Sequence, residues 1–446
     1  MGVALIVSLL FESGLESATR FSFKYLIDEA VVPRDAHRLV VLLSLLGSAA
    51  VLLAVITLVA DYIWAKLGAR VLNDLRSELY AHTHTLSVDF FQRRKSGDVL
   101  NCFIADADSV ESCLVTVVPY GLMGITGLIT STTLMASIHP AMAAATLVGT
   151  AICFLLPRVL LRYASKASLE MRRQEGRLSG TIQETLQSQF LIKVFGLERE
   201  LFRRFHNDSQ RLVNLTVRAN FLSYIVERIP TVSFFIFCLA IIGASSVIAF
   251  RGGMTIGAVI SFQMLALNLG TSIGNLTWLT PLVVDASAGL ERINEIFRER
   301  PTVPERANAR PIAPFAESIR FDGVEFAYAG VEPPRNILRD FTMEIRHGQF
   351  VVIVGPSGCG KSTVLHLLLR LYDPTAGRVL VDGTDIREAT FSSLRSQIGI
   401  VSQDVLLFDS SIRDNIRMGK LDATDQEILE AMEAAQCAHL ARRLPG

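Results

Sequence analysis

The sequence predicts an α-helical membrane bundle followed by a smaller α/β domain. Half of the 446 residues are hydrophobic and only 19% are charged, whereas a soluble chain of this length carries about 25% charged residues. The long uncharged runs all lie within residues 1–290, and the last part of the chain has the mixed composition of a soluble domain. This shift in composition predicts at least two domains.

Six segments are apolar enough to be considered as membrane spans. A helix needs about 20 apolar residues to cross the hydrocarbon core of a bilayer. The six predicted spans are residues 2–27, 39–64, 113–137, 141–161, 229–250 and 254–284. The first is the least regular of the six, because it contains charged residues.

Basic residues predict the orientation of these spans. Between Arg158 and Arg228 there are 13 Lys or Arg residues against 7 Asp or Glu residues, and basic segments stay in the cytoplasm. Residues 69–84 and 168–187 have helical periodicity, so we expect the spanning helices to continue far into the cytoplasm. The net charge of zero gives no indication of nucleic-acid binding, and the spacing of the six cysteines predicts neither a metal site nor a disulfide.

The α/β part contains a glycine-rich motif in a specific context. Residues 350–354 (FVVIV) have the β-branched composition of a buried strand, residues 355–362 (GPSGCGKS) match G-x-x-x-x-G-K-[ST], and residues 363–371 continue as an apolar helix. Strand, loop and helix in this order identify a P-loop. The fold class predicted for this part is therefore an α/β P-loop NTPase domain that binds a nucleotide with Mg²⁺, and the loop alone does not distinguish a kinase from a GTPase or a transporter.

Each fixed position of the loop has a chemical reason. Gly355, Gly358 and Gly360 let successive backbone N–H groups point at phosphate oxygens. Lys361 would reach the β- and γ-phosphates, and the Ser362 hydroxyl would bind Mg²⁺. The predicted nucleotide site also includes the neighbouring residues Ser357, Cys359 and Thr363.

The sequence around this loop resembles the nucleotide-binding domain of ABC transporters. The resemblance rests on segments on both sides of the loop, namely residues 321–328, 371–377, 381–386, 394–404 and 412–416. Residues 90–108 and 192–198 resemble the two cytoplasmic loops of six-span, domain-swapped ABC exporters. The resemblance implies an exporter transmembrane domain at residues 1–298, a linker at 299–316 and the N-terminal part of a nucleotide-binding domain at 317–446.

The resemblance also implies roles for single residues. Tyr328 would stack on adenine, the alternative being a core tyrosine. Gln403 would contact Mg²⁺ and the attacking water, the alternative being a solvated loop residue. Residues 105–112 and 192–198 would be the coupling helices that dock on the nucleotide-binding domain. A second half-transporter, identical or different, would complete the assembly.

Three catalytic parts of the family are not found in the 446 residues: the signature loop of LSGGQ type, the strand ending in Asp-Glu and the later histidine. The candidates fail by position: residues 178–180 (LSG) lie in a predicted membrane-domain helix, Asp382 precedes Gly383 in a turn, and His366 and His439 come too early. We therefore expect a chain truncated at its C-terminus, and short at its N-terminus, that binds Mg-ATP without hydrolysing it. The alternative is a non-catalytic membrane fragment or a regulatory half that acts only with a complete partner.

Charged residues in the first span suggest what is transported. Glu12, Glu16, Arg20 and Lys24 recur every four residues and therefore follow one stripe of a helix. They either line a cavity for a small or amphipathic substrate or form salt bridges among themselves. Gln263, Asn268 and Asn275 in the sixth span either line the pathway or, as we favour, bond helix to helix. We expect an integral, multi-pass protein of the bacterial inner membrane, in contact with lipid, with its ATP-binding domain in the cytoplasm.

Overall fold

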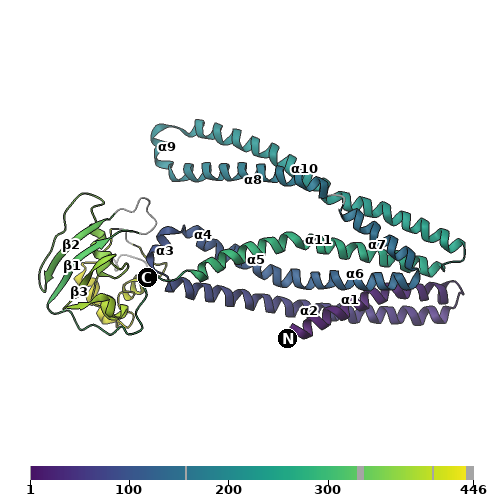
Figure 1. Ribbon diagram of the computed structural model, residues 1–446, viewed down its shortest axis with the longest axis horizontal. Coiled ribbons are helices and arrows are strands. Elements are labelled where there is room, and N and C mark those ends of the chain that lie inside the picture. Colours follow the sequence, from purple (N-terminus) through teal and green to yellow (C-terminus); the bar gives the residue numbers. More distant parts are fainter. Residues whose placement is uncertain (1, 156–157, 329–335, 404–405, 438–446) are drawn as a thin grey trace. The chain divides into compact units, whose positions relative to one another are not determined.

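The computed structural model describes residues 2–155, 158–328, 336–403 and 406–437 of the chain (Figure 1). They form two compact bodies. The helical body consists of Met1–Leu86 and Arg94–Arg300, and the C-terminal body consists of Ser87–Arg93 and Pro301–Gly446.

The helical body is built from long, nearly uninterrupted helices. Its α-helices are α1 (Gly2–Tyr25), α2 (Ala36–Thr85), α4 (Ser96–Asn101), α5 (Ala107–Ser112), α6 (Val118–Ile138), α7 (Pro140–Leu155), α8 (Arg158–Gln187), α9 (Gln189–Phe195), α10 (Glu198–Phe250) and α11 (Ile256–Arg298). Short π-helical turns, η1 (Leu26–Val31), η2 (Cys102–Asp106) and η3 (Cys113–Val117), extend or join them. The expected helices at residues 69–84 and 168–187 are confirmed as parts of α2 and α8.

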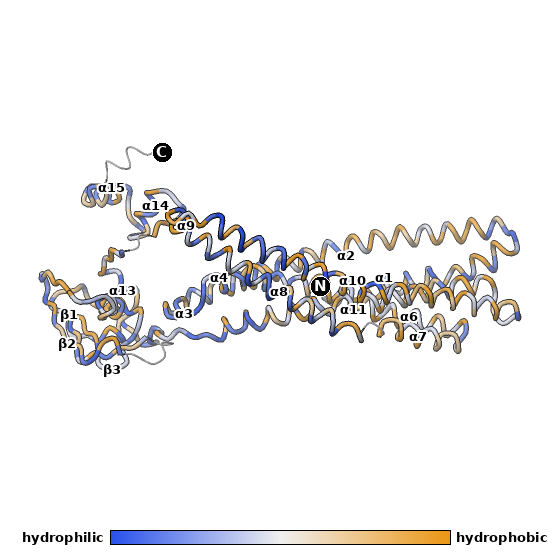
Figure 2. The backbone as a smooth tube through the Cα atoms, turned by 90° about the horizontal axis from the view of Figure 1, so that it is seen from above, coloured by the Kyte–Doolittle hydropathy of each residue, from blue (hydrophilic) through white to orange (hydrophobic). Residues whose placement is uncertain are grey.

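Five helical stretches in the described part of the chain are long and apolar enough to cross a membrane. They are Ala36–Thr85, Ser96–Ile138, Pro140–Gln187, Glu198–Phe250 and Ile256–Arg298. Figure 2 shows apolar residues gathered along α2, α6 and α7, whereas the stretch of α8 near α9 is hydrophilic. The remaining predicted span corresponds to α1, which contains four charged residues and is not one of these five.

Helix α11 is the centre of the helical body. Phe262, Leu265 and Leu269 have no exposed surface, and α11 packs against both α6 and α1. Gly127 of α6 allows this close approach, because a Cβ atom there would lie 2.5 Å from Ser272 Oγ. Asn268 donates a hydrogen bond of 2.9 Å to Ser131 of α6, which supports the interpretation that it bonds helix to helix.

The C-terminal body contains an antiparallel sheet with the strand order β2-β1-β3-β4. The strands are β1 (Ser318–Phe326), β2 (Leu338–Arg346), β3 (Ala376–Val381) and β4 (Thr384–Asp385). Its helices are α3 (Val88–Arg93), α12 (Lys361–Leu368), the 3₁₀ turn η4 (Ile386–Glu388), α13 (Phe391–Arg395), α14 (Ile412–Arg417) and α15 (Asp425–Ala434). The buried faces of β1, β3 and α12 form one core, in which Phe321, Val324 and Leu367 have no exposed surface.

The expectation about Asp382 is confirmed, and the expectation of a buried strand before the P-loop is wrong. Asp382 (φ 47°) and Gly383 (φ 76°) form the two-residue turn between β3 and β4, as expected of an Asp-Gly hairpin. Residues 350–354 form no strand, and Phe350 and Val354 are 92% and 82% exposed. A strand needs a neighbour to pair with, and no described strand lies beside these residues.

Candidate functional site

The P-loop is shaped by glycines. Gly358 and Gly360 have φ angles of +81° and +100°, in the left-handed region that favours glycine. A Cβ atom on the buried Gly360 would lie 2.9 Å from Leu338 Cδ2, and one on Gly355 would lie 2.7 Å from Cys359 Sγ. The loop can therefore curl tightly over the N-terminus of α12.

Lys361 lies over the loop. Its Nζ donates hydrogen bonds to the carbonyl oxygens of Gly355 at 2.8 Å and Pro356 at 2.9 Å. Both carbonyl groups are exposed, so a phosphate could replace them as partners of the Lys361 ammonium group. Since Lys361 is also the first residue of α12, its charge adds to the positive end of the helix dipole, which favours an anion at this place.

The other predicted loop residues differ in how far they are exposed. Ser357, Cys359 and Ser362 are exposed and can be reached by a ligand, whereas Thr363 is buried. A hydroxyl at the exposed start of α12 suits a hard cation such as Mg²⁺. The residue types and the geometry of the loop therefore suit a nucleotide bound together with Mg²⁺.

Tyr328 lies in the core beside α12. Its hydroxyl is 3.1 Å from Thr363 Oγ1 and 3.2 Å from His366 Nδ1. Its ring packs edge-on against Phe326 and Tyr372, with centroid distances of 4.8 and 5.2 Å. This is the arrangement of a core tyrosine, so stacking on adenine would require the ring to leave these contacts.

Gln403 is not brought to the loop. It lies on an exposed bend, and no hydrogen bond joins it to residues 355–363 within the described part of the chain. His366 belongs to the tyrosine cluster, and His439 lies outside the described residues. The structure thus assembles Gly355, Gly358, Gly360 and Lys361, and the part that Gln403 takes in this site stays a prediction.

Sequence reasoning missed the charged network behind the loop helix. Arg370 is 1% exposed and donates to Asp373 Oδ1 at 3.2 Å, Ala389 O at 3.3 Å and Pro304 O at 3.0 Å. Its guanidinium also lies over the Phe391 ring, 4.9 Å from the centroid. Arg370 therefore ties the end of α12 to residues far away in the sequence.

The segment expected to be the first coupling helix, residues 105–112, is held by contacts within the helical body. Residues 105–112 lie within the helical stretch Ser96–Ile138, where Asp106 and Ala107 are 2% and 0% exposed. Asp106 accepts two hydrogen bonds from Arg292 of α11, at 2.6 and 2.9 Å. This pair packs η2 against α11, and docking of residues 105–112 on the nucleotide-binding domain stays a prediction.

One short segment from the first half of the chain, α3 with Ser87 before it, belongs to the C-terminal body. Asp89 of α3 accepts a hydrogen bond of 2.8 Å from Thr302, and Ser87 Oγ accepts one of 3.0 Å from the Val303 backbone. Burial raises the pKa of Tyr372 to about 12, and the neighbouring Asp89 carboxylate adds to this rise. α3 is thus integrated with the body that contains the P-loop. The Phe90-Phe91 pair that precedes the 105–112 segment would have been the sequence signal.

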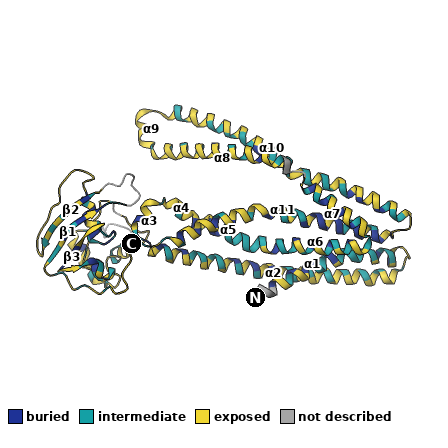
Figure 3. Ribbon diagram, in the orientation of Figure 1, coloured by how far each residue is buried: buried dark blue, intermediate teal, exposed yellow. Residues whose placement is uncertain are grey.

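The second coupling segment corresponds to α9 and the turn after it. Gly196 ends α9 with a φ of +61°, and the Leu197 N–H bonds back to Ile192 O at 3.1 Å. Ile192 faces inward, but Phe190, Val194 and Phe195 are 79%, 59% and 68% exposed. Most of α8 and α9 is exposed in Figure 3, so α9 presents an apolar surface to the solvent.

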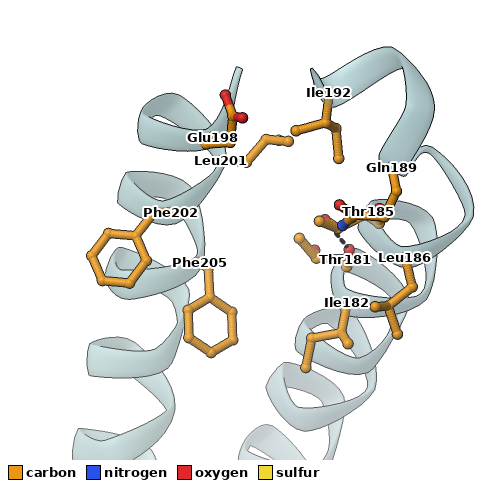
Figure 4. A pocket seen from close by; sticks show the side chains of 10 residues that line it. All are labelled: Thr181, Ile182, Thr185, Leu186, Gln189, Ile192, Glu198, Leu201, Phe202 and Phe205. Carbon is orange, nitrogen blue, oxygen red and sulfur yellow. Dashed lines mark hydrogen bonds between the residues drawn. The ribbon is translucent and has the colours of Figure 1, made fainter. Parts of the chain in front are cut away.

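A cavity of about 280 Å³ lies behind this surface, between α8 and α10. Figure 4 shows Leu201 and Phe205 pointing from α10 towards Ile182 of α8 and Ile192 of α9. The wall is mainly apolar and Glu198 lies at its rim. The cavity is therefore bounded by side chains of α8, α9 and α10.

In the charged stripe of α1, Glu16 and Arg20 form an ion pair, whereas Glu12 and Lys24 contact uncharged groups. Arg20 Nη2 donates to Glu16 Oε1 at 2.6 Å, as the salt-bridge alternative expects. Glu12 is 8% exposed and accepts a hydrogen bond of 2.7 Å from Thr57 of α2. Lys24 Nζ lies 6.0 and 5.9 Å from the ring centroids of Phe21 and Tyr25.

Comparison with known protein families decides the classification. The family model described as "ABC transporter transmembrane region" matches residues 3–273, and the model "ABC transporter" matches residues 338–446. The chain belongs to the ABC transporter family. It is therefore a multi-pass membrane protein with an ATP-binding domain.

Several curated ABC transporters align with most of the chain. YfiC, an ABC transporter ATP-binding protein of Bacillus subtilis, is 28% identical over 94% of this chain and 69% of its own length. A fatty acid ABC transporter ATP-binding/permease protein of Mycobacterium bovis is 29% identical over 89% of this chain and 63% of its own. An ATP-dependent lipid A-core flippase of Desulfotalea psychrophila is 26% identical over 98% of this chain and 76% of its own. The chain thus spans about two thirds to three quarters of the length of these relatives.

A solved ABC exporter has the same fold. The structure of a bacterial Atm1-family ABC exporter with ATP bound superposes with a TM-score of 0.78, at 24% identity, over 99% of this chain and 78% of its own. The predicted fold class, an exporter-type helical bundle with a partial nucleotide-binding domain, is confirmed.

Proposed function

We propose that this chain is the ATP-binding half of an ABC exporter, which couples ATP binding and hydrolysis to the export or flipping of a lipid, drug-like or peptide substrate. The observation that supports this most strongly is the P-loop, with Lys361 at the start of α12, on a chain with the helical body of an exporter. In this family, closure of two nucleotide-binding domains over ATP would switch the bundle between inward- and outward-facing states.

A few groups of the chain have separate roles in the proposed nucleotide site. Backbone N–H groups of Gly355 and of residues 357–360 would hold the phosphates, and Lys361 would exchange the Gly355 and Pro356 carbonyls for phosphate oxygens. Ser362 and Gln403 would hold Mg²⁺, which neutralises phosphate charge when bound. Gln403 would have to approach the loop, and Tyr328 would have to turn out of the core to meet adenine.

A second half-transporter is the proposed partner, either another copy or a different chain. The support is the exposed apolar surface formed by Phe190, Val194 and Phe195 of α9, because contiguous exposed apolar surface is typical of protein interaction sites. α3 and α9 would transmit nucleotide state to the helices. The bacterial sources of the relatives support the bacterial inner membrane as the location.

The proposed substrate is a lipid or another amphipathic molecule. Two of the relatives are named for fatty acids and lipid A-core, and another is named as a putative multidrug export protein of Bacillus subtilis. We place substrate contact at the α1 stripe of Glu12, Glu16, Arg20 and Lys24. Glu12 is the strongest candidate of these, because Glu16 and Arg20 neutralise each other.

We further propose that these 446 residues alone bind Mg-ATP and do not hydrolyse it. No glutamate is found after a strand in a position to act as base, and no LSGGQ-type loop is found in the sequence. If the chain acts instead as a regulatory half, its partner would supply the signature loop for the shared site.

Substitution of Lys361 tests the nucleotide site. We expect the Lys361→Ala variant of the full chain to bind a fluorescent ATP analogue at least about tenfold more weakly, because a charge-assisted contact to phosphate is lost. Lys420→Ala is the matched control, since Lys420 forms an exposed ion pair with Glu427 outside the loop. Equal binding by Lys361→Ala and Lys420→Ala would reject the P-loop as the nucleotide site.

A further inference from the structure

A small apolar cavity lies between α1 and α2. It has a volume of about 260 Å³ and is lined by Leu5 and Ser8 of α1 and by Val55, Val59 and Ile63 of α2. The Ser8 hydroxyl is already bonded to Leu5 O at 2.8 Å, so the wall offers no free polar group of its own. The cavity therefore fits a slender hydrocarbon group.

A buried carboxylate lies next to this cavity. Glu12 is one helical turn from Ser8, and its partner Thr57 lies on α2 among the cavity residues Ile56 and Val59. One carboxylate oxygen, Oε1, accepts the Thr57 hydroxyl at 2.7 Å. Among the residues that the structure describes, no cation pairs with Glu12 and no donor reaches its second oxygen.

The nearby charges do not neutralise Glu12. Arg20 is engaged with Glu16 at 2.6 Å, and Lys24 lies beside the rings of Phe21 and Tyr25 one turn further on. Thr57 belongs to the uncharged run at residues 39–60 and lies four residues before Asp61. The carboxylate therefore lies within the apolar part of the body, near the end of that part.

A negative charge in such surroundings is unfavourable unless a cation meets it. An ammonium group suits the free oxygen because it has three N–H donors on one compact centre. An alkyl group attached to that nitrogen would extend into the adjoining cavity and leave water. The carboxylate and the apolar wall thus fit the two ends of one molecule.

We propose that the α1–α2 cavity binds an amphiphile with a protonated amine, with the ammonium on Glu12 and the apolar body between Leu5 and Val59. This inference deepens the proposed export function by naming a cationic amphiphile as the substrate class. It also makes Glu12 the residue that selects charge, with Thr57 holding the carboxylate in position.

Trp64 provides a direct reporter of this site. It is buried in the same cluster as Leu5, Leu9 and Ala60, and the chain has only one other tryptophan, Trp278, which is 58% exposed. In the full chain in detergent, the Trp278→Phe background leaves Trp64 as the sole fluorophore. A primary alkylamine with a terminal bromine would quench Trp64 on contact, and the alcohol of equal length is the uncharged probe.

We expect the bromoalkylamine to quench Trp64 saturably, and Glu12→Gln to weaken its affinity at least about tenfold. The matched variant Glu16→Gln should stay within about twofold, and Thr57→Val should lie between them. The bromoalkyl alcohol should give only the linear quenching of a probe dissolved in detergent, in every variant.

Three outcomes would overturn the proposal: no saturable quenching by the amine, unchanged affinity in Glu12→Gln, or saturable quenching by the alcohol with equal affinity, which would indicate a merely apolar site. The result is independent of the nucleotide proposal. Lys361→Ala should weaken ATP binding and leave amine quenching intact, so either idea can fail without the other.

Discussion

Arg370 shows how single buried contacts organise the ATP-binding domain. Its guanidinium joins the end of α12 to Pro304, Asp373 and Ala389, and it is 1% exposed. Arg395 lies nearby, stacks over Phe391 with a centroid distance of 4.3 Å and donates to the Arg370 carbonyl at 3.0 Å. Burial lowers the pKa of Arg395, as expected of a cation taken out of water.

We expect Arg370→Met to lower the free energy of opening around α12 by about 3 kcal/mol, because two carbonyls and a carboxylate lose their donor in the interior. Amide hydrogen exchange of the full chain over residues 364–395 measures this. The control is Arg378→Met, whose exposed pair with Asp322 should contribute less than about 1 kcal/mol. Equal protection in Arg370→Met and Arg378→Met would disprove the structural role.

The residues of the P-loop could be predicted from the sequence, but their neighbours could not. Lys361 and Gly355 act through contacts inside eight consecutive residues, so the local motif contains most of the loop geometry. Tyr328 depends on contacts with Thr363 and His366, more than 30 residues away, and Thr57 meets Glu12 across 45 residues. No local pattern encodes such pairs.

At the scale of helices, the Asp106–Arg292 pair fixes α11 to the turn η2. Hydrogen bonds from Arg292 hold the pKa of Asp106 below its ordinary value of 3.8, against the opposing effect of burial. The pair therefore stabilises the folded state above about pH 4, and this stabilisation is lost as the pH falls through the lowered pKa. Burial also raises the pKa of the adjoining Cys102 thiol to about 11, so Cys102 stays neutral there.

We expect Arg292→Met to lower the local opening free energy at residues 102–108 by about 2–3 kcal/mol at pH 7, because it leaves a buried carboxylate unpaired. The loss should be much smaller when both proteins are compared below pH 3, and the double variant Asp106→Asn/Arg292→Met should recover part of it. Arg76→Met, which breaks an exposed pair with Asp108, is the control. A pH-independent loss would contradict this account. Hydrogen exchange again provides the measurement.

The exposed face of α9 gives a prediction about assembly. We expect Phe190→Asp/Phe195→Asp to leave the fold of the chain intact, since both side chains are largely exposed, but to abolish cross-linking between differently tagged chains in membranes supplied with Mg-ATP. Lys193→Ser, on the same helix, should retain it. Undiminished cross-linking of the double aspartate variant would show that α9 is not part of the interface.

Elements were predictable where their stability is local. Long apolar runs need no partner to be recognised as helices, and the Asp382-Gly383 turn is defined by two residues. The strand expected at 350–354 requires a neighbouring strand, and no described strand provides one. This error arises from tertiary contacts that composition does not encode, whereas the docking role of residues 105–112 stays a prediction.

At the scale of the whole chain, the family could be predicted because its motifs are spread along both bodies. Hydropathy and charge indicated the membrane bundle, and the P-loop with its flanking segments indicated the ATP-binding domain. Whether nucleotide is turned over depends on parts that a P-loop does not contain, namely a general base and a signature loop.

The central claim is that these 446 residues hold Mg-ATP on the P-loop without consuming it. One measurement tests this directly: phosphate release from saturating Mg-ATP by the full purified chain, with bound nucleotide counted in the same sample. We predict saturable binding with no phosphate release above that of Lys361→Ala. Continuous release by the unsubstituted chain that Lys361→Ala abolishes, or the absence of saturable binding, would contradict the account.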